Sequence, residues 1–331
     1  MLYVPILKCK QGEKDALLTL QDNIKDQILP LLEVTPDIIE KGTFAGVQDF
    51  WVKRLFIFDI SPEYYSEMSD KEYVALYRKT DFEFSIPTIK LADDEEKINE
   101  LKSLSQNGLA LRVYLEEILD DDFQSNYEDL LKHIDSSKTD LIIDAQSVEV
   151  KRINEVSFLV KGALSSINNI DKFRNVIFSS NSFPKSLEVE RNKLSVLPRI
   201  ESKLFQKVLS QSTVNLIYSD YSINHWTYFE FILGIQPSFN IRYTTENSYV
   251  IFKGETNKKG GLKIDKVQAA CKLLTDSEYF LGKDYSWGDL EIHSRANGDI
   301  SKSGNLTTWR AIGTNHHITL IVNHLSNQFE S

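Results

Sequence analysis

Short apolar runs and one-faced amphipathic segments alternate along the first two thirds of the chain. The run 2–7 is followed by a charge at Lys8, residues 11–27 repeat apolar positions at helical spacing, and a second apolar run, 28–32, is followed by Glu33. Runs of this length are too short for buried helices, so the pattern predicts a strand, a helix and a second strand. A βαβ unit of this kind closes right-handed and builds a parallel sheet.

The same alternation recurs as far as residue 221. Strands are expected at eight places: 2–7, 28–32, 55–58, 86–89, 109–114, 141–143, 176–178 and 214–218. Capping-box patterns at 69–72 and 125–128 predict two of the intervening helix starts. Eight strands separated by helices is the count of a (β/α)8 barrel, so we expect an α/β fold of the TIM-barrel type. Pro30 and Pro87 weaken two of these strands, because each lacks a backbone donor for the ladder.

An open, doubly wound sheet is the alternative, because strand count alone does not establish closure. Nucleotide binding is the usual reason to prefer the open sheet. The chain contains neither a GxGxxG nor a GxxxxGKS/T motif, so that reason is missing and the closed barrel is favoured.

The rhythm changes after residue 221. Segments 240–245 and 248–252 predict a hairpin, residues 258–261 a flexible turn, and residues 267–274 a helix. Residues 305–325 are interpreted as the eighth outer helix, although 318–322 has the composition of a strand as well. We therefore expect three parts: barrel strands and helices at 1–221, an α+β elaboration on the barrel rim at 222–304, and a C-terminal helix that closes the barrel at 305–331.

Composition narrows the choice of function. The 331 residues include 41% hydrophobic positions, enough for a substantial core, and carry a net charge of -10, which argues against a protein that coats a nucleic-acid backbone but permits a local basic pocket. Cys9 and Cys271 match no disulfide or metal spacing and are expected to be reduced structural thiols. No leader peptide opens the chain and no apolar stretch reaches the ~18 residues of a membrane span. These features predict a soluble, cytoplasmic protein.

Charged residues stand at the expected carboxyl ends of the strands. They are Lys8, Glu33, Asp59, Lys90, Arg112, Asp144 and Asp220. In a closed barrel these ends form one mouth, where charges of both signs shift one another's pKa values. The candidate catalytic groups are therefore the carboxylates Glu33, Asp59, Asp144 and Asp220, and the candidate cations are Lys8 and Arg112. The alternative is that several of these side chains point outward as helix caps.

The C-terminal segment supplies a second candidate group. Free amides at the start of the 305–325 helix, together with Trp309 and Arg310, would form an anion site. His316 and His317 diverge by about 100° on a helix and are poor joint metal ligands. We expect one packed and one surface histidine, or a general acid or base at His316.

Two further polar groups have competing interpretations. Arg242 and Tyr243 are candidates for substrate binding near the eighth strand, or are structural residues of the hairpin. Residues 287–289 are expected to form a turn packed by an indole.

The chain resembles the bacterial and phage "beta family" proteins. The pieces that carry the resemblance are 3–8, 11–13, 30–33, 219–221, 241–244, 286–289, 308–310 and 315–317. Residues 60–200 match only in their strand-helix rhythm, and 184–198 is a departure expected to alter the loop after the seventh strand. The family resembles proteins encoded near antiphage defence genes, which implies a defence role with a partner encoded nearby or a phage component. It implies no catalytic residue.

Two hypotheses of different classes follow. In the first, the protein is an enzyme that hydrolyses a phosphate-bearing substrate, a nucleotide or nucleic-acid end, in the barrel mouth. The carboxylates act as acid and base or hold a divalent metal ion, the only cofactor the sequence suggests, while Lys8, Arg112, Arg242 and Arg310 neutralise phosphate. In the second, the barrel is a non-catalytic scaffold that binds a phage or partner protein through residues 222–304.

Overall fold

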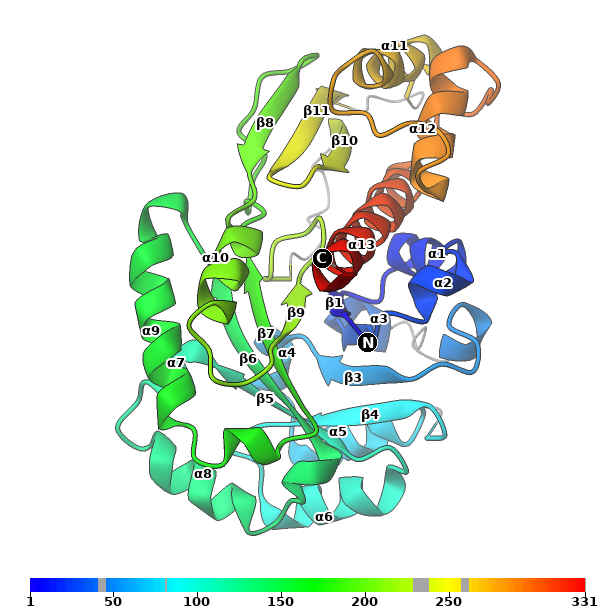
Figure 1. The fold of residues 1–331 in the computed structure, drawn as a ribbon. Coiled ribbons are helices and arrows are strands. Elements are labelled where there is room, and N and C mark those ends of the chain that lie inside the picture. Colours follow the sequence, from blue (N-terminus) through cyan, green and yellow to red (C-terminus); the bar gives the residue numbers. More distant parts are fainter. Residues whose placement is uncertain (41–45, 81, 229–237, 257–261, 331) are drawn as a thin grey trace.

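The computed structural model describes residues 1–40, 46–80, 82–228, 238–256 and 262–330 (Figure 1). Eight strands pair in parallel and close on themselves. In barrel order they are β1 (Tyr3–Leu7), β2 (Leu31–Val34), β3 (Phe56–Ile60), β4 (Ser85–Ile89), β5 (Leu109–Tyr114), β6 (Thr139–Ser147), β7 (Asn175–Asn181) and β9 (Ile217–Asp220). The ring closes where Val4 of β1 pairs with Ser219 of β9. The prediction of a closed (β/α)8 barrel is confirmed.

Helices cover the outside of the barrel. They are α1 (Gln11–Leu18), α2 (Asp22–Lys25), α3 (Pro36–Glu40), α4 (Pro62–Tyr65), α5 (Asp70–Tyr77), α6 (Glu95–Leu104), α7 (Leu115–Ile118), α8 (Phe123–Leu131), α9 (Ile153–Ser166) and α10 (Ile200–Leu209). The capping box at Ser69 is confirmed, since its hydroxyl accepts from the amide of Glu72. The box predicted at Ser125 is wrong. Helix α8 begins two residues earlier, and Ser125 lies inside it.

The first predicted unit also needs correction. The single helix expected over 11–27 is two helices. Helix α1 ends at Leu18, where the Thr19 hydroxyl bonds to the carbonyl of Asp15 at 2.8 Å, and α2 begins at Asp22. Strand β2 starts later than the apolar run suggests, so Pro30 precedes the strand and Glu33 lies within it. Pro87, by contrast, does lie within its strand.

Inside the barrel, the side chains that face inward form an apolar layer and, two residues further along each strand, a polar layer. The barrel interior is filled by one apolar cluster that includes Ile57, Ile86, Ala110, Ile142 and Ile177. Because side chains on a strand face the same way every second residue, the next inward position on each of these strands is two residues further on. Those positions are Asp59, Thr88, Arg112, Asp144 and Ser179, all of them buried.

A second sheet lies beside the barrel. The predicted hairpin is confirmed as β10 (Ser238–Thr244) and β11 (Ser248–Thr256), which pair antiparallel. Residues 194–198, expected only as part of an irregular loop, form strand β8 (Leu194–Pro198) on the outer edge of β11. The flexible turn predicted at 258–261 lies outside the described residues.

Three helices connect this sheet to the barrel: α11 (Ile264–Thr275), α12 (Trp287–Asn297) and α13 (Leu306–Glu330). The turn expected at 287–289 is instead the first turn of α12, capped by Ser286. Helix α13 packs against α12 and β10 in its amino-terminal half and against α1 of the barrel (Figure 1). A helix over 305–325 is thus confirmed, and the division of the chain at residues 221 and 304 stays a prediction.

Candidate active site at the barrel mouth

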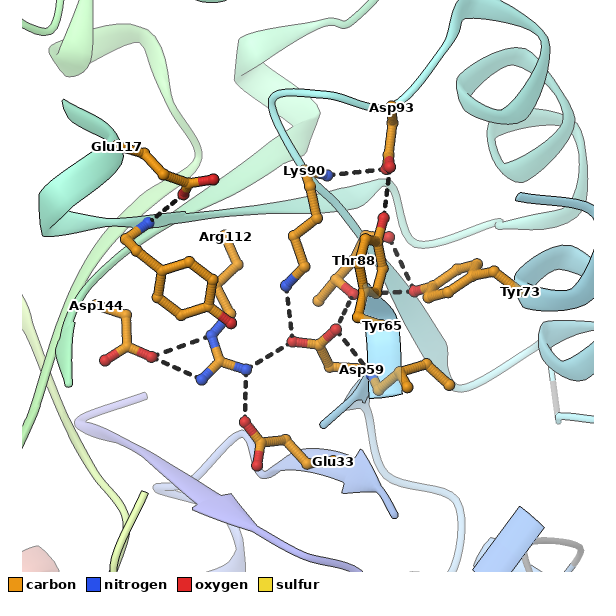
Figure 2. Close-up of polar contacts among 12 residues, drawn as sticks. Glu33, Asp59, Tyr65, Tyr73, Thr88, Lys90, Asp93, Arg112, Glu117 and Asp144 are labelled. Carbon is orange, nitrogen blue, oxygen red and sulfur yellow. Dashed lines mark hydrogen bonds and ion pairs between the residues drawn. The ribbon is translucent and has the colours of Figure 1, made fainter. Parts of the chain in front are cut away.

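The guanidinium of Arg112 lies at the centre of the polar layer and binds three carboxylates from three other strands (Figure 2). One terminal nitrogen donates to Glu33 and to Asp59, each at 2.7 Å. The other terminal nitrogen and Nε donate to Asp144 at 2.6 and 3.1 Å. All four side chains are fully buried. The structure therefore brings these four predicted residues together, and the two predicted lysines described next join them.

Two lysines complete the ring of charges. The Lys8 ammonium donates to Glu33, and the Lys90 ammonium donates to Asp59 at 3.0 Å. Three cations thus face three carboxylates, and the ring, here called the ionic ring, has no net charge. Such a balance is what makes buried charges tolerable, because each would otherwise carry an uncompensated desolvation cost.

Neighbouring cations and hydrogen bonds hold Asp59 ionised. Asp59 accepts from the Thr88 hydroxyl at 2.6 Å and from the amide of Ile60 at 2.8 Å. Burial raises the pKa of Asp59, but the charges of Lys90 and Arg112 and the hydrogen bonds from Thr88 and Arg112 outweigh it and bring the pKa down to about 2. A carboxylate with so low a pKa is a weak general base at neutral pH.

The outer edge of the ring is aromatic. The Lys90 ammonium lies 5.3 Å from the centre of the Tyr65 ring and 5.7 Å from that of Tyr114. The Tyr114 hydroxyl is buried and has no hydrogen-bond partner in the described part of the chain. Beside it, Glu117 accepts from the Tyr114 amide at 2.7 Å, and burial raises the pKa of Glu117 despite that bond and the nearby Lys90 (Figure 2).

Sequence reasoning missed Tyr114 and Glu117. The signal for Tyr114 was present, since it stands two residues beyond Arg112 and must face the same way. Glu117 could have been found as the third residue after Tyr114, a spacing at which a glutamate caps the start of a helix.

Asp220 does not join the ionic ring, which corrects the prediction. Its neighbour Tyr221 faces inward and donates to Asp144, so Asp220 faces the outside of the barrel. There it accepts from Tyr3 at 2.5 Å and lies 3.1 Å from Nε2 of His317. Burial raises the pKa of Asp220, but His317 and the other partners lower it well below its ordinary range. Asp220 therefore ties the barrel to α13.

His316 and Tyr243 lie in a different buried cluster. Nδ1 of His316 is 2.7 Å from Asp289, and its Nε2 is 2.7 Å from the carbonyl of Thr244. Its ring stacks on Tyr243 with 3.9 Å between centres, and Tyr243 also donates to Asp289 at 2.7 Å. Both adjacent histidines are fully buried, so the expectation of one surface histidine is wrong. The cluster joins β10 to α12 and α13.

The remaining predicted residues lie near the start of α13. Trp309 packs edge-on against Phe239 at 4.9 Å between centres and is part of the apolar core of the second sheet. The start of α13 is capped by the Asn305 side chain, which accepts from the amide of Thr308 at 3.0 Å. The free amides expected there are thus partly satisfied. Arg242 and Arg310 form a separate cluster that is treated below.

The described residues include no group of three or more His, Cys, Asp or Glu side chains arranged to hold a metal ion. The reason at the mouth is that a guanidinium occupies the space between the three carboxylates. Over the same residues, no helix combines the length and apolarity needed to cross a bilayer.

Fold and site together define a (β/α)8 barrel whose mouth is built on a buried, charge-balanced ionic ring. Residues 3–323 match the model of the Beta protein family, and the chain belongs to that family. This confirms the resemblance seen in the sequence. "Protein beta" of Enterobacteria phage P4 is 28% identical over 170 residues, which cover 49% of this chain and 45% of the phage protein. The chain therefore matches less than half the length of that relative.

Among solved structures, triosephosphate isomerase from Bartonella henselae is similar at 10% identity and a TM-score of 0.35. The similarity covers 67% of this chain and 92% of the isomerase. The barrel assignment rests on the strand pairing described above.

Proposed function

We propose that this protein is an antiphage-defence enzyme that hydrolyses a phosphate-bearing substrate, a nucleotide or a nucleic-acid end, at the barrel mouth. The observation that carries the proposal is the placement of Lys8 and Lys90. Both ammonium groups lie at the outer edge of the ionic ring with about 6% of each residue exposed, in the position where (β/α)8 barrels bind their substrates. The defence role is supported only by the family likeness.

Lys90 is suited to bind the phosphate. An ammonium group has three hydrogens to donate, and Asp59 is the one hydrogen-bond partner of the Lys90 ammonium among the described residues. The remaining hydrogens are available to a phosphate oxygen, and the unpartnered Tyr114 hydroxyl can donate a further bond. Arg112 holds the three carboxylates in place and does not itself need to touch the substrate.

Glu117 is the best candidate for proton transfer. Burial raises its pKa toward neutrality, as acid-base catalysis requires, whereas the pKa of Asp59 in the ionic ring is lowered. Water attacks phosphorus, the bond from phosphorus to the leaving oxygen breaks, and protonated Glu117 gives its proton to that oxygen. The proton that the water loses passes through solvent to the Glu117 carboxylate and restores the acid. On this proposal Glu33, Asp59 and Asp144 position the cations and are not the catalytic acid or base.

The test is a product-release assay on nucleotides and on short oligonucleotides with labelled ends. Lys90→Met and Glu117→Gln are expected to lose turnover, while Lys138→Met is expected to keep it, because Lys138 is exposed and precedes β6 at the opposite end of the barrel. Phage plating efficiency on cells that carry each variant then tests the defence role.

The scaffold hypothesis is favoured by one observation, the neutrality of the ionic ring, which leaves no carboxylate without a cation. If the protein is a scaffold, Glu117→Gln keeps full defence while changes within residues 222–304 abolish it. That outcome would overturn the proposal that the protein is an enzyme.

A further inference from the structure

A second cluster of cations comes from α13 and from the segments of α1 and β10, two elements that both pack against α13 (Figure 1). It contains Lys10 from the loop before α1, Arg242 from β10 and Arg310 from α13. Each is only partly exposed. Glu13, in the first turn of α1, is the carboxylate that acts on all three of them.

Both oxygens of Glu13 already accept hydrogen bonds from groups other than the arginines. One oxygen accepts from the side chain of Asn224 at 2.7 Å, and the other accepts from the amide of Lys10 at 3.2 Å. Among the described residues, Glu13 thus offers the two arginines a negative charge but accepts no hydrogen bond from either of them. Two guanidinium groups share this one carboxylate, whereas in the ionic ring every cation has its own.

Both arginines have N–H groups without an acceptor among the described residues. Arg242 donates from one terminal nitrogen to the carbonyl of Ile223 at 2.7 Å and from Nε to Asn240 at 3.0 Å. Its other terminal nitrogen makes no bond to the described residues. Arg310 makes no hydrogen bond or ion pair to any described residue. Burial lowers its pKa, and the negative charge of Glu13 only partly offsets this effect.

Like charges make the cluster receptive to an anion. Burial lowers the pKa of Arg242, and the positive charge of Arg310 lowers it further. Burial likewise lowers the pKa of Lys10, whose charge is favoured by Asp37 and Glu13 and opposed by Arg310 and Lys8. A bound anion would offset this burial and charge repulsion, because it stabilises the protonated form of each group.

We infer that Lys10, Arg242 and Arg310 form a phosphate subsite separate from the ionic ring. A planar guanidinium binds two phosphate oxygens at once, so paired arginines with free donors suit this ligand. The inference rests on the proposed function in taking the ligand to be the phosphate-bearing substrate. Lys10 stands two residues after Lys8 of the ionic ring, and the charge of Lys8 lowers its pKa. We therefore assign the subsite to a second phosphate group of a substrate bound at the mouth.

The subsite is tested by titrating the full chain with inorganic phosphate in a calorimeter at low ionic strength. Arg310→Gln is expected to weaken binding by roughly tenfold, the effect of losing one charge-assisted, bidentate contact. Glu13→Gln is expected to strengthen binding several-fold, because it removes the carboxylate that competes with phosphate and keeps the shape of the side chain. A gain of affinity cannot come from misfolding. Lys302→Gln, an exposed cation in the loop before α13, is the control and should bind as the parent does.

The outcomes separate this inference from the proposed function. Loss of phosphate binding in Lys90→Met but not in Arg310→Gln would overturn the inferred subsite and would still support phosphate binding at the barrel mouth. Equal binding by the parent, Arg310→Gln and Glu13→Gln, or no binding at millimolar phosphate, would also overturn it. Repeating the titration with a nucleoside triphosphate and with a 5′-phosphorylated oligonucleotide shows which source of phosphate the subsite favours.

Discussion

Arg112 is the residue on which the barrel mouth depends most, and its replacement gives the sharpest prediction. In Arg112→Met the stem of the side chain is kept, but three buried carboxylates retain only two lysines as partners. Breaking a buried set of charges by removing one partner costs about 3–5 kcal/mol. We expect the free energy of unfolding at pH 7 to fall by that amount.

The stability lost in Arg112→Met should also depend on pH. The pKa of Asp59 is about 2 in the folded protein against an ordinary value of 3.8, which corresponds to about 2 kcal/mol of stability. In the parent this contribution is present above pH 3.8 and is lost as the pH falls through about 2. In Arg112→Met a ring carboxylate has lost its cation and its pKa rises. The difference in stability between variant and parent should therefore narrow as the pH falls from 8 to 5.

Urea denaturation followed by circular dichroism at pH 8, 6.5 and 5 measures both effects. Arg152→Met is the matched control, because Arg152 contacts Glu155 through the same two nitrogens, at 3.1 and 2.8 Å, but on the surface. Its unfolding midpoint should not change, since exposed ion pairs contribute little. A loss below about 1 kcal/mol in Arg112→Met, with the pH slope of the parent, would refute the account of the ionic ring.

Three other predictions follow from single contacts. Burial raises the pKa of Glu117, so its contribution to stability is complete below pH 4.5 and is lost as the pH rises through the folded pKa. Between pH 4.5 and 7.5 the melting temperature of Glu117→Gln should therefore fall by less than that of the parent. Parallel plots of melting temperature against pH for the two proteins would contradict this. Gly288→Ala would place a methyl group 2.4 Å from a carbonyl of α13 and should cost about 1–3 kcal/mol in urea, whereas Gly162→Ala, with open space around it, should gain about 0.5–1 kcal/mol. Burial raises the pKa of the Cys9 and Cys271 thiols to about 12, so neither should react with a disulfide reagent until the protein unfolds, and rapid labelling of the native protein would contradict their burial.

The barrel could be predicted because its signal is local. Each strand is a short apolar run, and a charge in or just after the run marks the mouth. This signal is enough to place Glu33, Asp59, Arg112 and Asp144 together. Strand β8 could not be found in this way, because it is held by pairing with β11, more than fifty residues further along the chain.

The errors at Asp220 and at the two histidines have different physical origins. Whether a strand-end side chain faces the mouth or the outer helices depends on the register of the strand, and a shift of one residue reverses the answer. Asp220 was assigned to the mouth because it ends an apolar run, yet Tyr221 takes the inward position. The burial of both His316 and His317 could not be read from the helix pattern, because they face different partners, Asp289 and Asp220, that come from distant parts of the chain.

The most direct test of the central claim is to locate an anion in the barrel mouth. Crystals soaked in tungstate, which has the shape and charge of phosphate and scatters anomalously, would show where the anion binds. The account predicts an anomalous peak within hydrogen-bonding distance of the Lys90 ammonium, at the edge of the ionic ring, that disappears in Lys90→Met. Peaks confined to exposed lysines, or to the cluster of Arg242 and Arg310, with the mouth empty at saturating tungstate, would contradict it.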